Sequence, residues 1–263
     1  MSAAPSCTTC ANCAARRPAS ARRNTSPKPE KNRKSPAQRG FFGSGTDHAP
    51  NGTLRLPPLD TLALEQHACS RGFALVAGVD EAGRGPLAGP VVAAAVILPE
   101  GLRIPGVDDS KKLSPETRER LFDVIQSQAL AIGVGMGSPE LIDRINILQA
   151  TRHAMLEAVS ALSPLPDFIL IDGITPIDSV IPQQTVKKGD SLSLSIAAAS
   201  IIAKVTRDRL MRELDAVHPG YGFAGHKGYG SAAHLAAIRR LGPSPVHRLS
   251  FGGVKEHVPC PSS

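Results

Sequence analysis

The feature that most constrains this chain is a pair of adjacent acids, Asp80-Glu81, that follows the apolar run 73–79. A short, continuous apolar run of this kind is typical of a buried β-strand. Four glycines lie within the twelve residues from Gly78 to Gly89, and glycine lets a backbone adopt positive φ or approach a ligand closely. Two carboxylates at a strand end are costly unless a positive group lies between them. The segment indicates a metal centre, and the alternative for the segment alone is an exposed acidic turn.

Basic residues are concentrated at the N-terminus. The formal net charge is +7, yet residues 1–45 contain nine Lys or Arg and one acid, whereas the remainder contains 21 basic and 22 acidic residues. The first 60 residues are rich in Ser, Pro, Ala and Arg and have no periodic apolar pattern, which predicts a disordered basic extension that adheres weakly to nucleic acid. Nucleic-acid binding by the rest of the chain must therefore depend on local patches.

The cysteines and the hydropathy indicate the compartment. There are five cysteines, an odd number, with no signal-peptide pattern and no apolar run of about 18 residues. We therefore expect a cytoplasmic protein with reduced thiols and no membrane association. Cys7, Cys10 and Cys13 have a spacing that could bind zinc or an iron–sulfur centre, but no fourth ligand lies nearby, which argues against a metal site there.

Strand and helix patterns begin after residue 61. Ser114-Pro115 has the N-cap and first-turn proline of a helix start. We expect strands at 73–80, 89–98, 130–136 and 168–171, and helices at 62–72, 114–129, 139–162, 195–217 and 231–241. In this order of elements, strands come first and helices alternate with strands later. The order predicts an α/β fold with a mixed sheet flanked by helices and a small helical C-terminal subdomain.

Further acids follow the predicted strands. Asp172 ends the strand at 168–171, where α/β sheets commonly place ligand-binding residues, and Asp190 precedes the long helix. On that helix Ser200, Lys204 and Asp208 share one face. Individually these residues have structural alternatives: a strand–turn closure for Asp172, a helix cap for Asp190, and an i,i+4 ion pair for Lys204 and Asp208.

The chemistry of the acids favours a hard cation. Carboxylates without a supporting His or Cys set prefer Mg²⁺ or Mn²⁺, and two such ions about 4 Å apart suit phosphodiester cleavage. The chain has no HExxH, Cys₄ zinc, GxSxG or Walker A pattern.

Several separate motifs, in order, resemble bacterial ribonuclease HII of the type 2 ribonuclease H family. The resemblance runs from about residue 74 to 255 and rests on the segments at 78–85, 109–113, 170–173, 188–191, 198–208, 221–223 and 226–229. It implies a ribonuclease H-like fold. Together with the disordered extension at 1–60 that the composition predicts, we expect a catalytic domain at 61–215, a helical substrate-binding segment at 216–258 and a tail at 259–263.

The activity that the resemblance implies is endonucleolytic. It covers cleavage of RNA in RNA–DNA hybrids and incision at single ribonucleotides embedded in duplex DNA, as in ribonucleotide excision repair, leaving 3′-hydroxyl and 5′-phosphate ends. The implied cofactor is Mn²⁺ or Mg²⁺, and we expect a monomer. The implied metal-binding and catalytic carboxylates are Asp80, Glu81, Asp172 and Asp190, with Asp208 as a weaker candidate.

Substrate contacts are also implied. Gly83, Arg84 and Gly85 would recognise the ribose 2′-hydroxyl through backbone groups, which agrees with the close approach that glycine permits. Tyr229 would stack on the sugar 3′ of the ribonucleotide, with ordinary packing as the alternative. Phosphate contacts are expected from Lys111 and, on charge alone, from Lys187, Lys188, Arg239, Arg240 and Arg248, for which a solvated face is an equal alternative.

Two other classes of protein are alternatives to ribonuclease HII. The sister enzyme ribonuclease HIII carries an additional N-terminal domain of strands and helices, and the first 60 residues lack that pattern. A catalytically dead hybrid-binding protein would retain the fold, but all four expected acids are present, which favours the enzyme.

Overall fold

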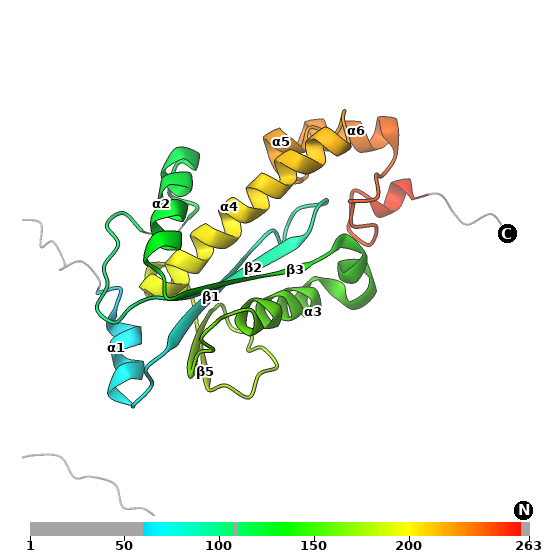
Figure 1. Cartoon of the computed structure of the whole chain (residues 1–263). Helices are drawn as coiled ribbons and strands as arrows, with labels where there is room; N and C mark the ends of the chain where they lie inside the picture. The colour runs from blue at the N-terminus through cyan, green and yellow to red at the C-terminus, as the bar shows by residue number, and fades with distance from the viewer. Residues whose placement is uncertain (1–59, 108–109, 259–263) are drawn as a thin grey trace, which may run out of the picture. The chain divides into compact units, whose positions relative to one another are not determined.

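The computed structural model describes residues 60–107 and 110–258 (Figure 1). The predicted basic extension with Cys7, Cys10 and Cys13 lies outside the described residues, as do Asp108 and Asp109 of the 109–113 motif. In the part of the chain that the structure describes, no helix is long and apolar enough to cross a membrane.

The centre of the fold is a five-stranded mixed sheet, which confirms the predicted fold class. Its strand order is β3-β2-β1-β4-β5. β1 pairs with β2, and β2 with β3, in antiparallel fashion, whereas β4 runs parallel to both β1 and β5. The bounds are β1 Val76–Ala82, β2 Val91–Ile97, β3 Ala131–Gly137, β4 Phe168–Asp172 and β5 Gln183–Val186.

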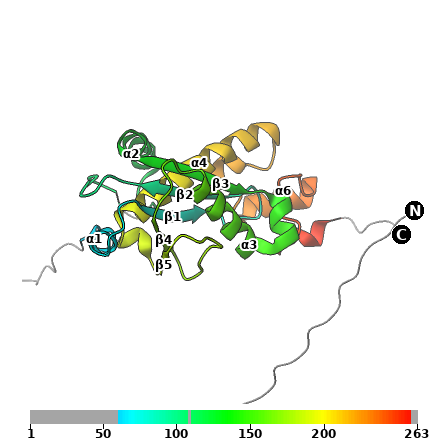
Figure 2. The ribbon, with the colours of Figure 1, turned by 60° about the horizontal axis from the view of Figure 1, so that its bottom comes forward.

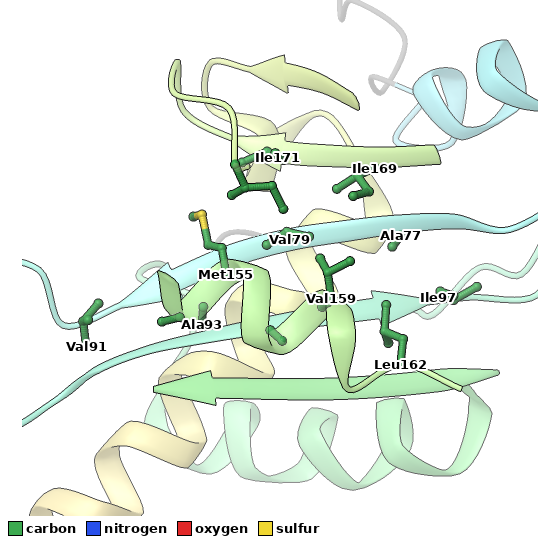
Figure 3. Close-up of a cluster of buried hydrophobic side chains, with 14 of the residues drawn as sticks. Ala77, Val79, Val91, Ala93, Ile97, Met155, Val159, Leu162, Ile169 and Ile171 are labelled. Carbon is green, nitrogen blue, oxygen red and sulfur yellow. The ribbon is translucent and has the colours of Figure 1, made fainter. Parts of the chain in front are cut away.

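Helices cover both faces of this sheet (Figures 1 and 2). α3 (Pro139–Ser160) packs on one face, while α4 (Leu194–Val217) lies across the other with α2 (Pro115–Gln128) beside it. Alternate residues of β2 divide between the two layers, because successive side chains point to opposite faces. Figure 3 shows Met155, Val159 and Leu162 of the α3 layer against the strands.

The predicted strand bounds needed two changes. β1 begins three residues later than expected and continues two residues beyond Asp80, because it remains paired with β2 as far as Ala82 and Val92. β5 was not predicted, since its sequence Gln-Gln-Thr-Val is mostly polar and only Val186 is buried. This edge strand extends the sheet beside β4 and leads directly to Asp190.

The helix predictions are confirmed, with local detail added. Ser114, Ser138, Ser193 and Ser231 each accept a backbone N–H bond as N-cap residues. α3 is kinked at Asn146, which has φ 68°. The remaining helices are α1 Ala63–Ser70, α5 Phe223–His226 and α6 Ala232–Leu241, with short 3₁₀ turns at Gly189–Ser191 and Lys255–His257.

Gly78 allows α4 to approach the sheet closely. A Cβ at this position would overlap the backbone of Ser195 and Ile196 at the start of α4. We expect Gly78→Ala to lower the free energy of unfolding by about 3 kcal/mol, because neither backbone can move without disturbing the core. Urea unfolding checks this value, and Gly252→Ala, where a Cβ meets nothing within 4 Å, is the matched control. A loss below about 1 kcal/mol for Gly78→Ala would contradict the close packing.

Candidate active site

The sheet topology brings Asp80 and Asp172 together. β1 and β4 run parallel with Val79 opposite Ile171, so the next residues along, Asp80 near the end of β1 and Asp172 at the end of β4, lie side by side. Asp80 is 4% exposed and accepts a hydrogen bond from the backbone N–H of Glu81 at 2.7 Å. The expectation that acids after separate strands converge is met by this pair.

Glu81 completes the acidic group on β1. Its side chain is mostly buried and forms an ion pair with Arg84, with 3.1 Å between Oε1 and Nη1. Burial raises the pKa of Glu81, Arg84 lowers it and Asp172 raises it again, which indicates that the Asp172 carboxylate is close by.

Asp190 lies on the 3₁₀ turn that follows β5. It is 7% exposed, and Lys111 Nζ lies 3.7 Å from its Oδ2. The same turn is bound to Asp172, whose Oδ1 accepts the N–H of Gly189 at 2.7 Å. Hence the turn that carries Asp190 is fixed relative to the carboxylate at the end of β4.

Burial and repulsion by neighbouring carboxylates dominate the electrostatics of Asp80 within the acidic cluster, which comprises Asp80, Glu81, Asp172 and Asp190. Burial raises the pKa of Asp80 well above its usual range, and the charges of Glu81 and Asp172 raise it further. Hydrogen bonds from Ser200 and from the Glu81 backbone oppose the rise. Buried like charges of this kind are costly without a cation.

The donor set fits a hard divalent cation. All the candidate ligands are carboxylate oxygens, and three of the four acids interact electrostatically with one another. In the described part of the chain, no group of three or more His, Cys, Asp or Glu side chains is arranged closely enough to form a ready metal cage. The four carboxylates supply a suitable donor set but do not form a ready cage in the described residues.

A cleft of about 240 Å³ borders the acidic cluster. It is lined by Glu81, the 83–85 segment, Lys111, Ser200, Lys204, Arg207 and Tyr229. Tyr229 is 49% exposed, and its ring lies next to Gly85, where an added Cβ would be in van der Waals contact with the ring, 3.7 Å from Cε1. Six predicted site residues thus line one cleft: Glu81, Gly83, Arg84, Gly85, Lys111 and Tyr229.

Two buried arginines, Arg207 and Arg248, hold the backbone of the 83–90 segment in place, a role that the sequence did not predict. Arg248 donates to the carbonyls of Gly83, Arg84 and Gly89, and Arg207 donates to those of Ala88 and Pro90. Both side chains are at most 1% exposed, and burial lowers the pKa of Arg248 to about 9. The expected phosphate contact of Arg248 was therefore wrong. The charge of Arg248 alone suggested a cation at the surface, whereas its guanidinium group is hydrogen-bonded to backbone carbonyls.

Gly83 has a structural reason to be glycine. Its φ is 96°, and an added Cβ would overlap the Arg207 side chain. The remaining basic candidates, Lys187, Lys188, Arg239 and Arg240, are exposed. Asp208 binds Lys204 at 2.6 Å and lies 4.0 Å from Arg118, which is the ion pair that the helix spacing suggested.

Comparison with known proteins agrees with this arrangement. The sequence pattern of the family described as ribonuclease HII matches residues 77–254. A ribonuclease HII from Pelobacter propionicus is 70% identical over 207 residues, covering 79% of this chain and 94% of that protein. Another from Geobacter sp. strain M21 is 70% identical over 202 residues, covering 77% and 88%. The crystal structure of ribonuclease H2 from Pyrococcus horikoshii has a TM-score of 0.59 at 30% identity, covering 69% of this chain and 96% of that one.

The mixed sheet with its acidic cluster defines a ribonuclease H-like, metal-dependent endoribonuclease. The family match and the identities then place the chain more narrowly: it belongs to the ribonuclease HII family, whose members act on the RNA of RNA–DNA hybrids.

Proposed function

We propose that this enzyme, besides cleaving RNA in hybrids, incises duplex DNA at single embedded ribonucleotides and leaves 3′-hydroxyl and 5′-phosphate ends. The observation that carries the proposal is the cleft that the backbone of Gly83–Gly85 and the exposed Tyr229 ring line together, beside Glu81. This arrangement can contact one ribose closely without requiring a run of RNA.

Asp80, Glu81, Asp172 and Asp190 would hold two divalent cations, Mn²⁺ or Mg²⁺. When bound, such ions activate a water molecule and stabilise the leaving oxygen of a phosphodiester. The protein residues supply the negative charge that attracts the ions, and the Gly189 N–H orients one carboxylate oxygen of Asp172. Lys111, near Asp190, would contact a substrate phosphate.

Ribose recognition would come from the protein backbone. Arg207 and Arg248 fix the carbonyls of the 83–90 segment, so its remaining polar groups have a defined direction. A 2′-hydroxyl can both donate and accept, and it is the group that distinguishes RNA from DNA. Tyr229 would stack on the sugar 3′ of the ribonucleotide, and this stacking would hold the ribose of the ribonucleotide against Gly85.

The direct test is a cleavage assay on duplex DNA with one ribonucleotide, with Mn²⁺, Mg²⁺ or EDTA. We expect one metal-dependent cut beside the ribonucleotide and none in all-DNA duplex. Binding without cutting under every metal condition would favour the catalytically inactive hybrid-binding protein. Sedimentation of the enzyme in the same buffers tests the further proposal that it acts as a monomer.

Gly85→Ala separates recognition from folding. The added methyl would be in ordinary van der Waals contact with Tyr229 and would project from the surface that the ribose is proposed to contact. We expect unfolding free energy within about 0.5 kcal/mol of wild type and at least a tenfold lower kcat/KM on the single-ribonucleotide duplex, about 1.4 kcal/mol in transition-state stabilisation. Stability comes from urea unfolding and kcat/KM from initial rates.

Gly83→Ala is the comparison variant. Because its Cβ would displace Arg207, we expect this change to reduce both stability and incision. If Gly85→Ala cuts at the wild-type rate, the ribose is not bound against Gly85 beside Tyr229, and the proposed mode of recognition is wrong.

A further inference from the structure

An unbroken chain of hydrogen bonds joins Ser244 to the carbonyl of Tyr229. The backbone N–H of Ser244 donates to His247 Nδ1 at 2.9 Å. His247 Nε2 lies 3.0 Å from His234 Nε2, and His234 Nδ1 lies 2.9 Å from the Tyr229 carbonyl oxygen. The two imidazoles therefore connect a loop after α6 with the exposed ring at the active-site cleft.

The direction of this chain follows from the donors at its start. A backbone N–H can only donate, so His247 Nδ1 accepts it and carries no proton, and the Ser244 hydroxyl, 2.8 Å from the same nitrogen, then donates to it as well. A neutral His247 then has its proton on Nε2 and donates to His234 Nε2. That nitrogen must also be unprotonated, which places the proton of His234 on Nδ1, from where it is donated to the Tyr229 carbonyl.

The surroundings keep both rings neutral. His234 and His247 are at most 1% exposed, and Phe223 packs against both, with centroid distances of 5.5 Å. Burial and the neighbouring imidazole lower the pKa of His247 to about 4, and burial also lowers the pKa of His234. A proton added to either ring would give two donors facing each other.

A third imidazole fixes the other side of Tyr229. His226 stacks on His234 with 4.3 Å between centroids, and its Nδ1 accepts the N–H of Gly228 at 3.2 Å. The N–H of the residue before Tyr229 and the carbonyl of Tyr229 are thus both held by imidazole rings, while the phenol ring itself lines the cleft.

We propose that His234 and His247 are positioning residues for ribose recognition: they form an ordered, neutral pair that holds the Tyr229 carbonyl and so fixes the Tyr229 ring opposite Gly85. The proposal rests on the role of Tyr229 proposed above. It assigns a function to a buried polar pair that contacts neither substrate nor metal.

The first test is the proton position itself. Long-range ¹H–¹⁵N NMR of the full chain at pH 7 should show the proton of His247 on Nε2 and that of His234 on Nδ1. Either ring protonated on both nitrogens, or His247 with its proton on Nδ1, would overturn the proposal. This measurement needs no variant that must fold.

The second test uses fluorescence. The chain has no Trp and two Tyr, so Tyr221→Phe leaves Tyr229 as the single emitter. In that background His234→Leu removes the donor to the Tyr229 carbonyl, whereas His234→Asn keeps an N–H near the position of Nδ1. We expect faster anisotropy decay of Tyr229 in His234→Leu and near-normal decay in His234→Asn. Equal decay in all three proteins would overturn the proposal.

The third test is kinetic. We expect His234→Leu to raise KM for the single-ribonucleotide duplex about fivefold, as loss of one hydrogen bond would, and His234→Asn to restore most of it. Unchanged KM in a folded His234→Leu overturns the positioning role. Unchanged incision in Tyr229→Ala would instead overturn the recognition role of Tyr229, and this failure is distinguishable because the NMR and anisotropy are measured without substrate.

Discussion

Asp172→Asn is expected to lower the rate of hybrid cleavage about 1,000-fold while leaving hybrid binding largely intact. The substitution removes one negative charge from the acidic cluster where the divalent cations are proposed to bind, and loss of a single group that stabilises developing charge has effects of this size. The fold should tolerate it, because the Asn side-chain oxygen can still accept the N–H of Gly189 that Asp172 accepts at 2.7 Å.

Single-turnover cleavage and fluorescence-anisotropy binding measure the two effects separately. Asp178→Asn is the matched control, since it makes the same change of charge at an exposed residue a few positions beyond β4. Cleavage at the wild-type rate by Asp172→Asn, with Mn²⁺ or with Mg²⁺, would remove Asp172 from the metal-binding set.

Most of the sheet could be predicted from the sequence because its strands are apolar. β2 and β4 are buried runs, which constrain both their type and their position. β5 could not be predicted, since an edge strand of polar residues gives no hydrophobic pattern. The end of β1 was misplaced for a related reason: charged residues suggested a turn, yet pairing with β2 keeps Asp80 and Glu81 in the strand.

The residues of the site also divide into those that the sequence could locate and those that it could not. Acids that follow apolar strands could be located, because parallel neighbours end at one edge of a sheet. The buried residues that support the site could not be located, since nothing in the local sequence distinguishes Arg248 from a surface cation. Only the tertiary structure shows that its guanidinium faces three backbone carbonyls from a segment about 160 residues away.

Asp80→Asn is expected to make the metal-free enzyme more stable by about 1 to 2 kcal/mol while abolishing cleavage. Asp80 is buried beside Glu81 and Asp172, and replacement of an uncompensated buried charge by a neutral group of the same shape is often stabilising. The amide oxygen can continue to accept the Glu81 N–H. If the protein becomes more stable when this metal-binding carboxylate is neutralised, the geometry of the site serves a bound cation.

The pH dependence identifies the cause of that gain. Because the pKa of Asp80 is raised in the folded state, the native protein binds more protons than the unfolded chain above about pH 4, and stability is lost as the pH rises through the folded pKa. Urea unfolding in EDTA should therefore give similar stabilities for wild type and Asp80→Asn near pH 4 and diverging values by pH 7. Added Mn²⁺ should stabilise the wild type, by about 2.7 kcal/mol at 100 times its Kd, and the variant much less. If Asp80→Asn is less stable than the metal-free wild type at pH 7, Asp80 is part of the folding framework, and repulsion within the acidic cluster is not what a cation relieves.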